Sequence, residues 1–131
     1  MCTSQAGWCD SQKTMVSTVM KNSEIVQEKE FRGVIFPEEK RTFQWLFDPA
    51  TLYWTPDRAA ILKAEDLIAA YLKRNAPVIH KNLHKYLRQY AGVEIGNKRL
   101  VYINFFCQDH GVDWLNNEVI VKGYRGSNLY S

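Results

Sequence analysis

Residues 86–107 read YLRQYAGVEIGNKRLVYINFFC, and this stretch decides the fold. Two runs rich in β-branched and aromatic residues, 86–93 and 98–107, flank a short segment that contains Gly96 and Asn97. Glycine and asparagine between two such runs are typical of a β-hairpin turn. In the second run alternate side chains point to opposite faces, and we expect the core face to be the more apolar set, Val101, Ile103, Phe105 and Cys107, rather than Leu100, Tyr102, Asn104 and Phe106.

Upstream of the hairpin, residues 56–75 have the pattern of an amphipathic helix. Thr55 is a favoured N-cap, Pro56 suits the first helical position, and apolar residues follow at helical spacing through Ile61, Ile68 and Leu72. Pro77 ends the helix. A second short helix starting at Val78 is an open alternative, and it would shorten the first strand of the hairpin.

The remaining segments predict shorter elements. We expect strands at 32–36, at 41–47 with an aromatic face, and at 114–122 with Val119 and Val121 facing inward, followed by a stub at 127–130. Residues 1–23 have little apolar periodicity and are predicted to be a flexible N-terminal leader or tether. The order of elements in 24–131 predicts a single α+β domain with one long helix on a curled antiparallel sheet whose final strand is either missing or very short.

The composition narrows the classes of function. The chain has 131 residues, 46% apolar and 24% charged, which is typical of one folded domain. No apolar stretch is long enough for a transmembrane segment. The net charge of +3 is too small for a dedicated nucleic-acid binder, so we predict no nucleic-acid partner. No acidic residue lies between Asp66 and Glu94, and this basic stretch is a solvated face, a surface for an acidic protein, or one for lipid headgroups.

Three cysteines bear on the cellular compartment. An odd number without paired C-x-x-C spacing argues against a metal cluster. Cys2 directly follows Met1, so the chain is either a cytoplasmic protein or a bacterial lipoprotein whose lipid acceptor is Cys2. We favour the lipid-anchored or periplasmic location, where Cys9 and Cys107 could pair as a disulfide.

No motif names a chemistry. The chain lacks nucleotide-binding glycine loops and hydrolase elbows. His80 and His84 share a helical face but have no third ligand in sight, and pairing of Cys107 with His110 would need a core thiol to reach a loop. We therefore predict no enzyme activity, no metal and no cofactor.

The hairpin offers a candidate interaction surface instead. Aromatic and polar side chains are expected to line the outer sheet face, and these partner-binding candidates are Tyr86, Arg88, Tyr90, Tyr102 and Asn104. Tyrosine and arginine are enriched at binding hot spots. A missing final strand would also leave an exposed sheet edge that could form a homodimer.

Several short motifs together resemble one protein family. The matching residues are Phe47-Asp48-Pro49, Tyr53-Trp54-Thr55-Pro56, Tyr86, Arg88-Gln89-Tyr90, Gly92, Val101-Tyr102-Ile103-Asn104, Phe106-Cys107 and Trp114. Between about Trp45 and Lys122 the chain resembles small bacterial proteins with a cystatin-like fold, many of them predicted lipoproteins of unknown function. The resemblance implies a cystatin-like domain in the cell envelope and no assigned activity.

Two functions of different classes follow from these observations. The first is a non-catalytic envelope protein that acts by binding a protein partner, for example as an inhibitor or immunity protein. The alternative is a small-ligand binder or enzyme that uses a pocket between helix and sheet.

Overall fold

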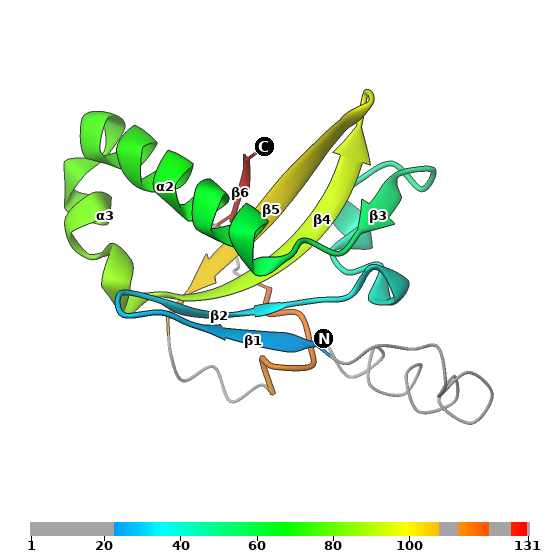
Figure 1. Ribbon diagram of the computed structural model, residues 1–131, viewed down its shortest axis with the longest axis horizontal. Helices are drawn as coiled ribbons and strands as arrows, with labels where there is room; N and C mark the ends of the chain where they lie inside the picture. Colours follow the sequence, from blue (N-terminus) through cyan, green and yellow to red (C-terminus); the bar gives the residue numbers. More distant parts are fainter. Residues whose placement is uncertain (1–22, 108–112, 121–126, 131) are drawn as a thin grey trace.

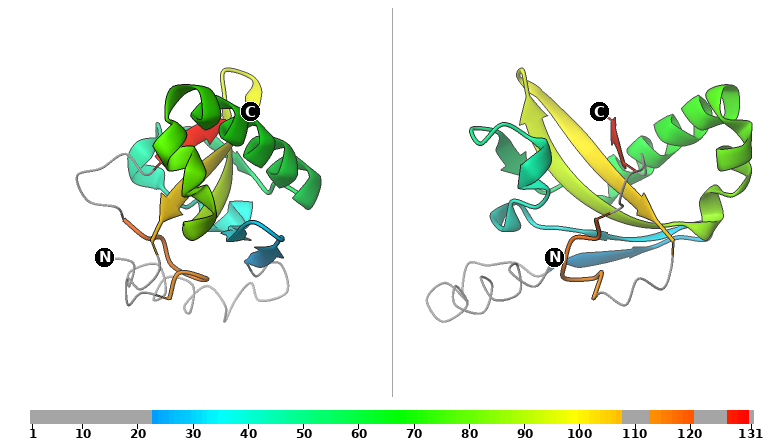
Figure 2. Two further views of the ribbon diagram at one scale, coloured as in Figure 1. Left: turned by 90° about the vertical axis from the view of Figure 1, so that its left-hand side faces the viewer. Right: turned by 180° about the vertical axis from the view of Figure 1, so that it is seen from behind.

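A computed structural model describes residues 23–107, 113–120 and 127–130 (Figure 1). One long helix, α2, crosses a strongly curled sheet, and short helical turns join the remaining elements (Figure 2). The strands are β1 (Glu24–Gln27), β2 (Arg32–Ile35), β3 (Leu52–Trp54), β4 (Leu87–Ile95), β5 (Lys98–Phe106) and β6 (Ser127–Tyr130), and the helices are η1 (Glu38–Lys40), η2 (Gln44–Leu46), α2 (Arg58–Asn75), α3 (Pro77–Lys81) and η3 (Leu83–Lys85).

The sheet has the order β1-β2-β4-β5-β6 and is mixed rather than wholly antiparallel as predicted. β2 runs parallel to the first half of β4, with Arg32 opposite Leu87 and Ile35 opposite Tyr90. β3 pairs antiparallel with the second half of the same edge of β4. One long strand therefore holds two short ones end to end, and this arrangement follows the curl of the sheet.

The predicted helix and hairpin are confirmed with small shifts. α2 begins two residues later than expected, because Asp57 is the N-cap and accepts a hydrogen bond from the Ala60 amide. Thr55 instead accepts from the Glu38 amide at the start of η1. The helix buries Ile61, Ala64, Ile68 and Leu72 against Val101, Ile103 and Phe105 of the sheet. The open alternative of a second helix is also realised, as α3.

The hairpin turn has two residues, Gly96 and Asn97, both with positive φ of 56° and 67°. This backbone suits the right-handed twist of the two strands. The predicted set Val101, Ile103 and Phe105 does face α2, but Cys107 is exposed, contrary to expectation. Cys2 and Cys9 lie outside the described residues, so the lipid attachment and the disulfide stay predictions.

The second face of the sheet is also buried. Val34, Phe36, Phe43, Ala91 and Tyr102 form a core there, and the segment 113–120 packs beside it. The predicted strand at 114–122 is wrong over its described part, because this segment has turns and no ladder. Val119 nevertheless faces inward as expected, whereas Val121 lies outside the described residues.

The predicted strand at 41–47 is wrong as well. Phe43 has a left-handed backbone (φ 60°), and η2 follows it. This bend places the Phe43 ring 4.8 Å from that of Tyr102 while Trp45 stays exposed. At the other end of the chain, β6 pairs antiparallel with β5, so the predicted stub is present as a final strand of four residues.

Candidate functional site

The predicted partner-binding face does not exist as an exposed surface. Arg88, Tyr90, Tyr102 and Asn104 are only 1%, 0%, 4% and 2% exposed, and Tyr86 packs against the core. These residues also lie on two faces. Arg88 and Tyr90 are opposite Phe105 and Ile103 and face α2, whereas Tyr102 and Asn104 are opposite Ala91 and Gln89 and face away from it. The prediction assumed an outer face open to solvent, and the segments 36–47 and 113–120 cover that face.

The buried residues of the inner face form an ion-pair network instead. Arg88 on β4 donates to the Glu65 carboxylate of α2 from Nε (3.0 Å) and Nη2 (3.2 Å). The Tyr90 hydroxyl donates to the same carboxylate at 2.7 Å. Bidentate pairing of this kind is both strong and geometrically specific. It therefore fixes the helix at one position along the strand.

The remaining contacts of Arg88 tie the network to the connection between α3 and β4. Nη1 donates to the carbonyls of Leu83 (3.1 Å) and Tyr86 (2.6 Å). The guanidinium carbon also lies 5.1 Å from the ring centres of Phe31 and Phe105. Burial, and secondarily the Glu65 charge, raises the pKa of Tyr90 well above its usual range, so Tyr90 stays a hydrogen-bond donor. The polar groups of Arg88, Glu65 and Tyr90 thus have hydrogen-bond partners within the protein. They form the floor of a hollow rather than a reactive centre.

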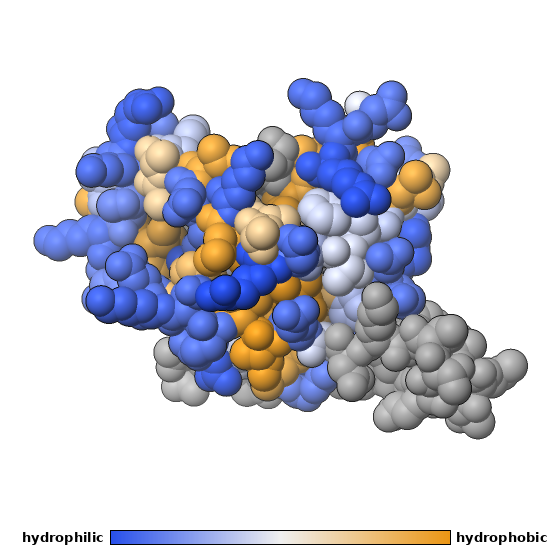
Figure 3. Space-filling view, viewed as in Figure 1, coloured by the Kyte–Doolittle hydropathy of each residue, from blue (hydrophilic) through white to orange (hydrophobic). Residues whose placement is uncertain are grey.

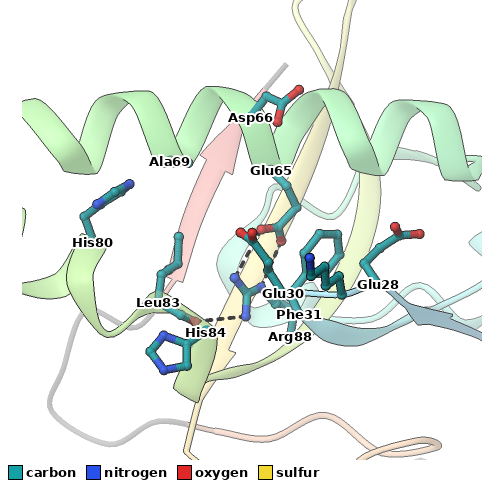
Figure 4. Close-up of a pocket in the computed structure, with 11 residues that line it drawn as sticks. Glu28, Glu30, Phe31, Glu65, Asp66, Ala69, His80, Leu83, His84 and Arg88 are labelled. Atoms are coloured by element: carbon teal, nitrogen blue, oxygen red, sulfur yellow. Dashed lines mark hydrogen bonds and ion pairs between the residues drawn. The ribbon is translucent and has the colours of Figure 1, made fainter.

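Above this floor a hollow of about 380 Å³ opens between α2, the α3–η3 connection and the β1–β2 turn (Figure 4). Glu65, Phe31, Ala69, Leu83 and Arg88 line its inner part. It therefore lies between helix and sheet, at the end of the domain where β4 begins.

The rim of the hollow carries mainly acidic side chains on one side and two histidines on the other. Glu28, Lys29 and Glu30 come from the β1–β2 turn, and Asp66 comes from α2. His80 and His84 stand on the opposite side, on α3 and η3 (Figure 4). The lining thus contains four carboxylates, two permanent cations and two imidazoles. Glu65 is paired with Arg88 and Glu28 with the exposed Arg58, whereas Glu30 and Asp66 have no ion pair within the described part of the chain.

Neither a metal-binding cluster nor a helix that could cross a bilayer is found among the described residues. In residues 23–107, 113–120 and 127–130, no cluster of three or more histidine, cysteine or acidic side chains is arranged to hold a metal ion. Over the same residues no helix combines the length and the apolar character of a bilayer span.

Comparison with protein-family models, with curated proteins and with solved structures finds no match to this chain. The cystatin-like family and its lipoprotein character therefore stay predictions. The structure itself establishes an α+β fold with a curled mixed sheet and one long helix.

Two signals in the sequence point to this pocket, although the sequence analysis did not use them. Glu65 interrupts the apolar stripe of the helix, and Arg88 stands within a strand on a face otherwise built from apolar and aromatic residues. A buried acid and a buried base in adjoining elements are expected to pair. The side of the hollow formed by the β1–β2 turn could not be predicted in this way, because this turn is distant in sequence from Glu65 and from Arg88.

Proposed function

We propose that the protein binds a small amine-bearing molecule in the hollow between α2 and the β1–β2 turn. The observation that carries the proposal is that two carboxylates in the lining of this hollow of about 380 Å³, Glu30 and Asp66, have no cationic partner among the described residues. A volume of this size suits a small ligand. An ammonium group would complete the charge balance of this rim.

The rest of the lining supports a ligand with a polar far end. His80 and His84 offer donors on the side opposite Glu30, so an oxygen acceptor at the second end of the ligand would find partners there. Phe31, Ala69 and Leu83 supply apolar surface between the two polar groups. We therefore favour a short zwitterion over a diamine or a dicarboxylate.

The proposal keeps the predicted non-catalytic character and moves the binding site. Glu65 accepts from Arg88 and Tyr90, and Tyr90 is held protonated, so neither group is poised to take a proton from a ligand. The protein-partner function was predicted from a face that is buried, and the small-ligand alternative has a built pocket to support it. Envelope location stays a prediction that this proposal does not need.

Calorimetric titration with three four-carbon probes tests the proposal. Putrescine carries two amines, γ-aminobutyrate one amine and one carboxylate, and succinate two carboxylates. We expect binding of putrescine or γ-aminobutyrate and none of succinate. The two amines distinguish whether the far end prefers a second cation or an anion.

Matched variants locate the binding. Glu30→Gln with Asp66→Asn should weaken amine binding by at least about tenfold, while Glu24→Gln with Glu94→Gln, which removes the same charge outside the hollow, should leave it unchanged. Ala69→Trp should block the hollow from α2. Equal binding of succinate, or equal losses in both double variants, would contradict the proposal.

A further inference from the structure

The end of the molecule formed by α3 carries exposed aliphatic side chains. Val78 is 74% exposed and Ile79 is 40% exposed, although both are large apolar residues. α3 has only five residues and starts at Pro77 directly after α2. Figures 1 and 2 place this corner at one end of the long axis, where it projects beyond the sheet.

Basic side chains surround these two residues in the chain. Lys73 and Arg74 end α2, Lys81 ends α3, and Lys85 ends η3, and all four are exposed. None of them has an ion pair within the described residues, and the sequence contains no acid from 67 to 93. Figure 3 shows hydrophilic side chains crowding this end of the surface. We call the six residues Lys73, Arg74, Val78, Ile79, Lys81 and Lys85 the α3 end.

We propose that the α3 end docks on the surface of an anionic lipid bilayer. Exposed basic residues are attracted to anionic headgroups, and aliphatic side chains between them can enter the boundary with the acyl chains. The long stems of lysine and arginine allow their charges to stay at headgroup level while Val78 and Ile79 go deeper.

The shape of the α3 end favours a bilayer over an acidic protein. A stable protein interface buries about 800 Å² on each partner and is centred on packed anchors, often aromatic. α3 forms a projecting corner of the fold, and two of its aliphatic side chains are exposed. A bilayer surface adapts to a convex corner and needs no matching cavity. The proposal is independent of the ligand pocket and of lipid attachment at Cys2.

Vesicle sedimentation with the full chain tests the docking. The probes are vesicles of phosphatidylglycerol and phosphatidylcholine in equal parts and vesicles of phosphatidylcholine alone. We expect binding to the anionic vesicles that is at least tenfold tighter than to the neutral ones, and that falls steeply between about 50 and about 500 mM salt.

Two pairs of matched variants place the contact. Val78→Ser with Ile79→Ser should weaken binding to anionic vesicles severalfold, whereas Ile25→Ser with Ile95→Ser, an equal loss of exposed apolar surface elsewhere, should not. Lys81→Gln with Lys85→Gln should weaken it by at least about tenfold, and more than Lys63→Gln with Lys98→Gln does.

Three results would overturn the docking proposal. The first is absence of binding to anionic vesicles at low salt, which would favour an acidic protein as the partner of the α3 end. Loss of binding in the control pairs as large as in the α3 pairs would show adsorption by net charge alone. Unchanged binding of the Val78→Ser, Ile79→Ser variant to anionic vesicles would show that these two side chains do not enter the bilayer. Circular dichroism of each variant verifies that the fold is kept.

Discussion

Gln89 and Asn104 lie directly opposite each other on β4 and β5, and the Asn104 side-chain amide donates to Gln89 Oε1 at 3.1 Å. Gln89 Nε2 donates to the carbonyls of Trp114 and Asn117 at 2.7 Å, and Gln89 Oε1 also accepts from the Val119 amide at 2.9 Å. The side-chain amides of Gln89 and Asn104 thus form the hydrogen bonds to the backbone of segment 113–119 that a neighbouring strand would usually form. This is why a segment without strand geometry can cover the second face of the sheet.

Gln89→Leu should destabilise the fold by about 3 kcal/mol, because it leaves several buried polar groups without their partner. Urea denaturation measures the loss. Gln44→Leu, at an exposed position of η2, is the matched control and should stay within about 0.5 kcal/mol of the parent. Equal stability of the two variants would show that the amide network does not hold the segment.

Glu65→Gln should cost about 3–5 kcal/mol, because it leaves the Arg88 guanidinium buried without its counter-charge. Replacing both partners, as Glu65→Leu with Arg88→Met, should recover a large part of this loss, since no buried charge then remains. A double-mutant cycle in urea gives the coupling. The exposed pair Arg58 and Glu28, replaced by Met and Gln, should show a coupling below about 1 kcal/mol. Additive losses at Glu65 and Arg88 would argue against a coupled pair.

Stability should depend on pH through Glu118. Burial raises the pKa of Glu118, while hydrogen bonds from the Phe43 backbone and the Trp45 indole and the Lys40 charge lower it in part. The folded state therefore binds the proton more tightly than the unfolded state, so this group opposes folding above its folded pKa and the penalty disappears as the pH falls toward 4.5.

Glu118→Gln should accordingly raise the thermal midpoint at pH 8 and flatten its decline from pH 5 to 8. The amide oxygen can still accept from Trp45 Nε1, which donates to the carboxylate at 3.3 Å in the parent. Glu24→Gln, at an exposed position, is the control. A lower midpoint for Glu118→Gln at pH 8 would mean that the ionised carboxylate stabilises the fold.

Gly92→Ala should prevent stable folding or lower stability by several kcal/mol. A Cβ at this position would collide with the Trp54 carbonyl oxygen and crowd its indole ring, because Trp54 of β3 is paired directly opposite Gly92 of β4. Gly96→Ala is the informative comparison. Its Cβ would enter open space, so only the positive φ of 56° opposes it, at about 1 kcal/mol. Similar losses at the two glycines would contradict the close approach of β3.

The parts of the fold that could be predicted are those with long local patterns. Residues 58–75 repeat the helical period over five turns, and the hairpin joins two nine-residue strands through Gly96 and Asn97. β1 and β2 have four residues each. The strand expected at 32–36 is confirmed as β2, whereas β1 stands among dense charges and its few apolar residues give no clear period. The parallel pairing of β2 with β4 depends on residues more than 50 positions away.

The errors about surfaces have a different physical origin. Alternation along β5 shows that its two faces differ, but it does not show whether a second layer covers the less apolar one. Tyr102 and Asn104 look like outer-face residues from their polarity, yet turns at 36–47 and 113–120 bury both. Phe43 and Trp45 alternate as in a strand, and the left-handed backbone at Phe43 sends only one of them into the core.

The parallel pairing of β2 with β4 also orders events in folding. The β4–β5 hairpin and α2 form through contacts between near neighbours, whereas Gly33 meets Arg88 only after the 54 intervening residues have closed as a loop. We therefore expect β1 and β2 to join late and to be the first strands to open. Since the turn between them supplies Glu28 and Glu30, the hollow beside α2 exists only while this late-joining unit is in place, and backbone amides of β1 and β2 should exchange hydrogen with solvent faster than those of β4 and β5.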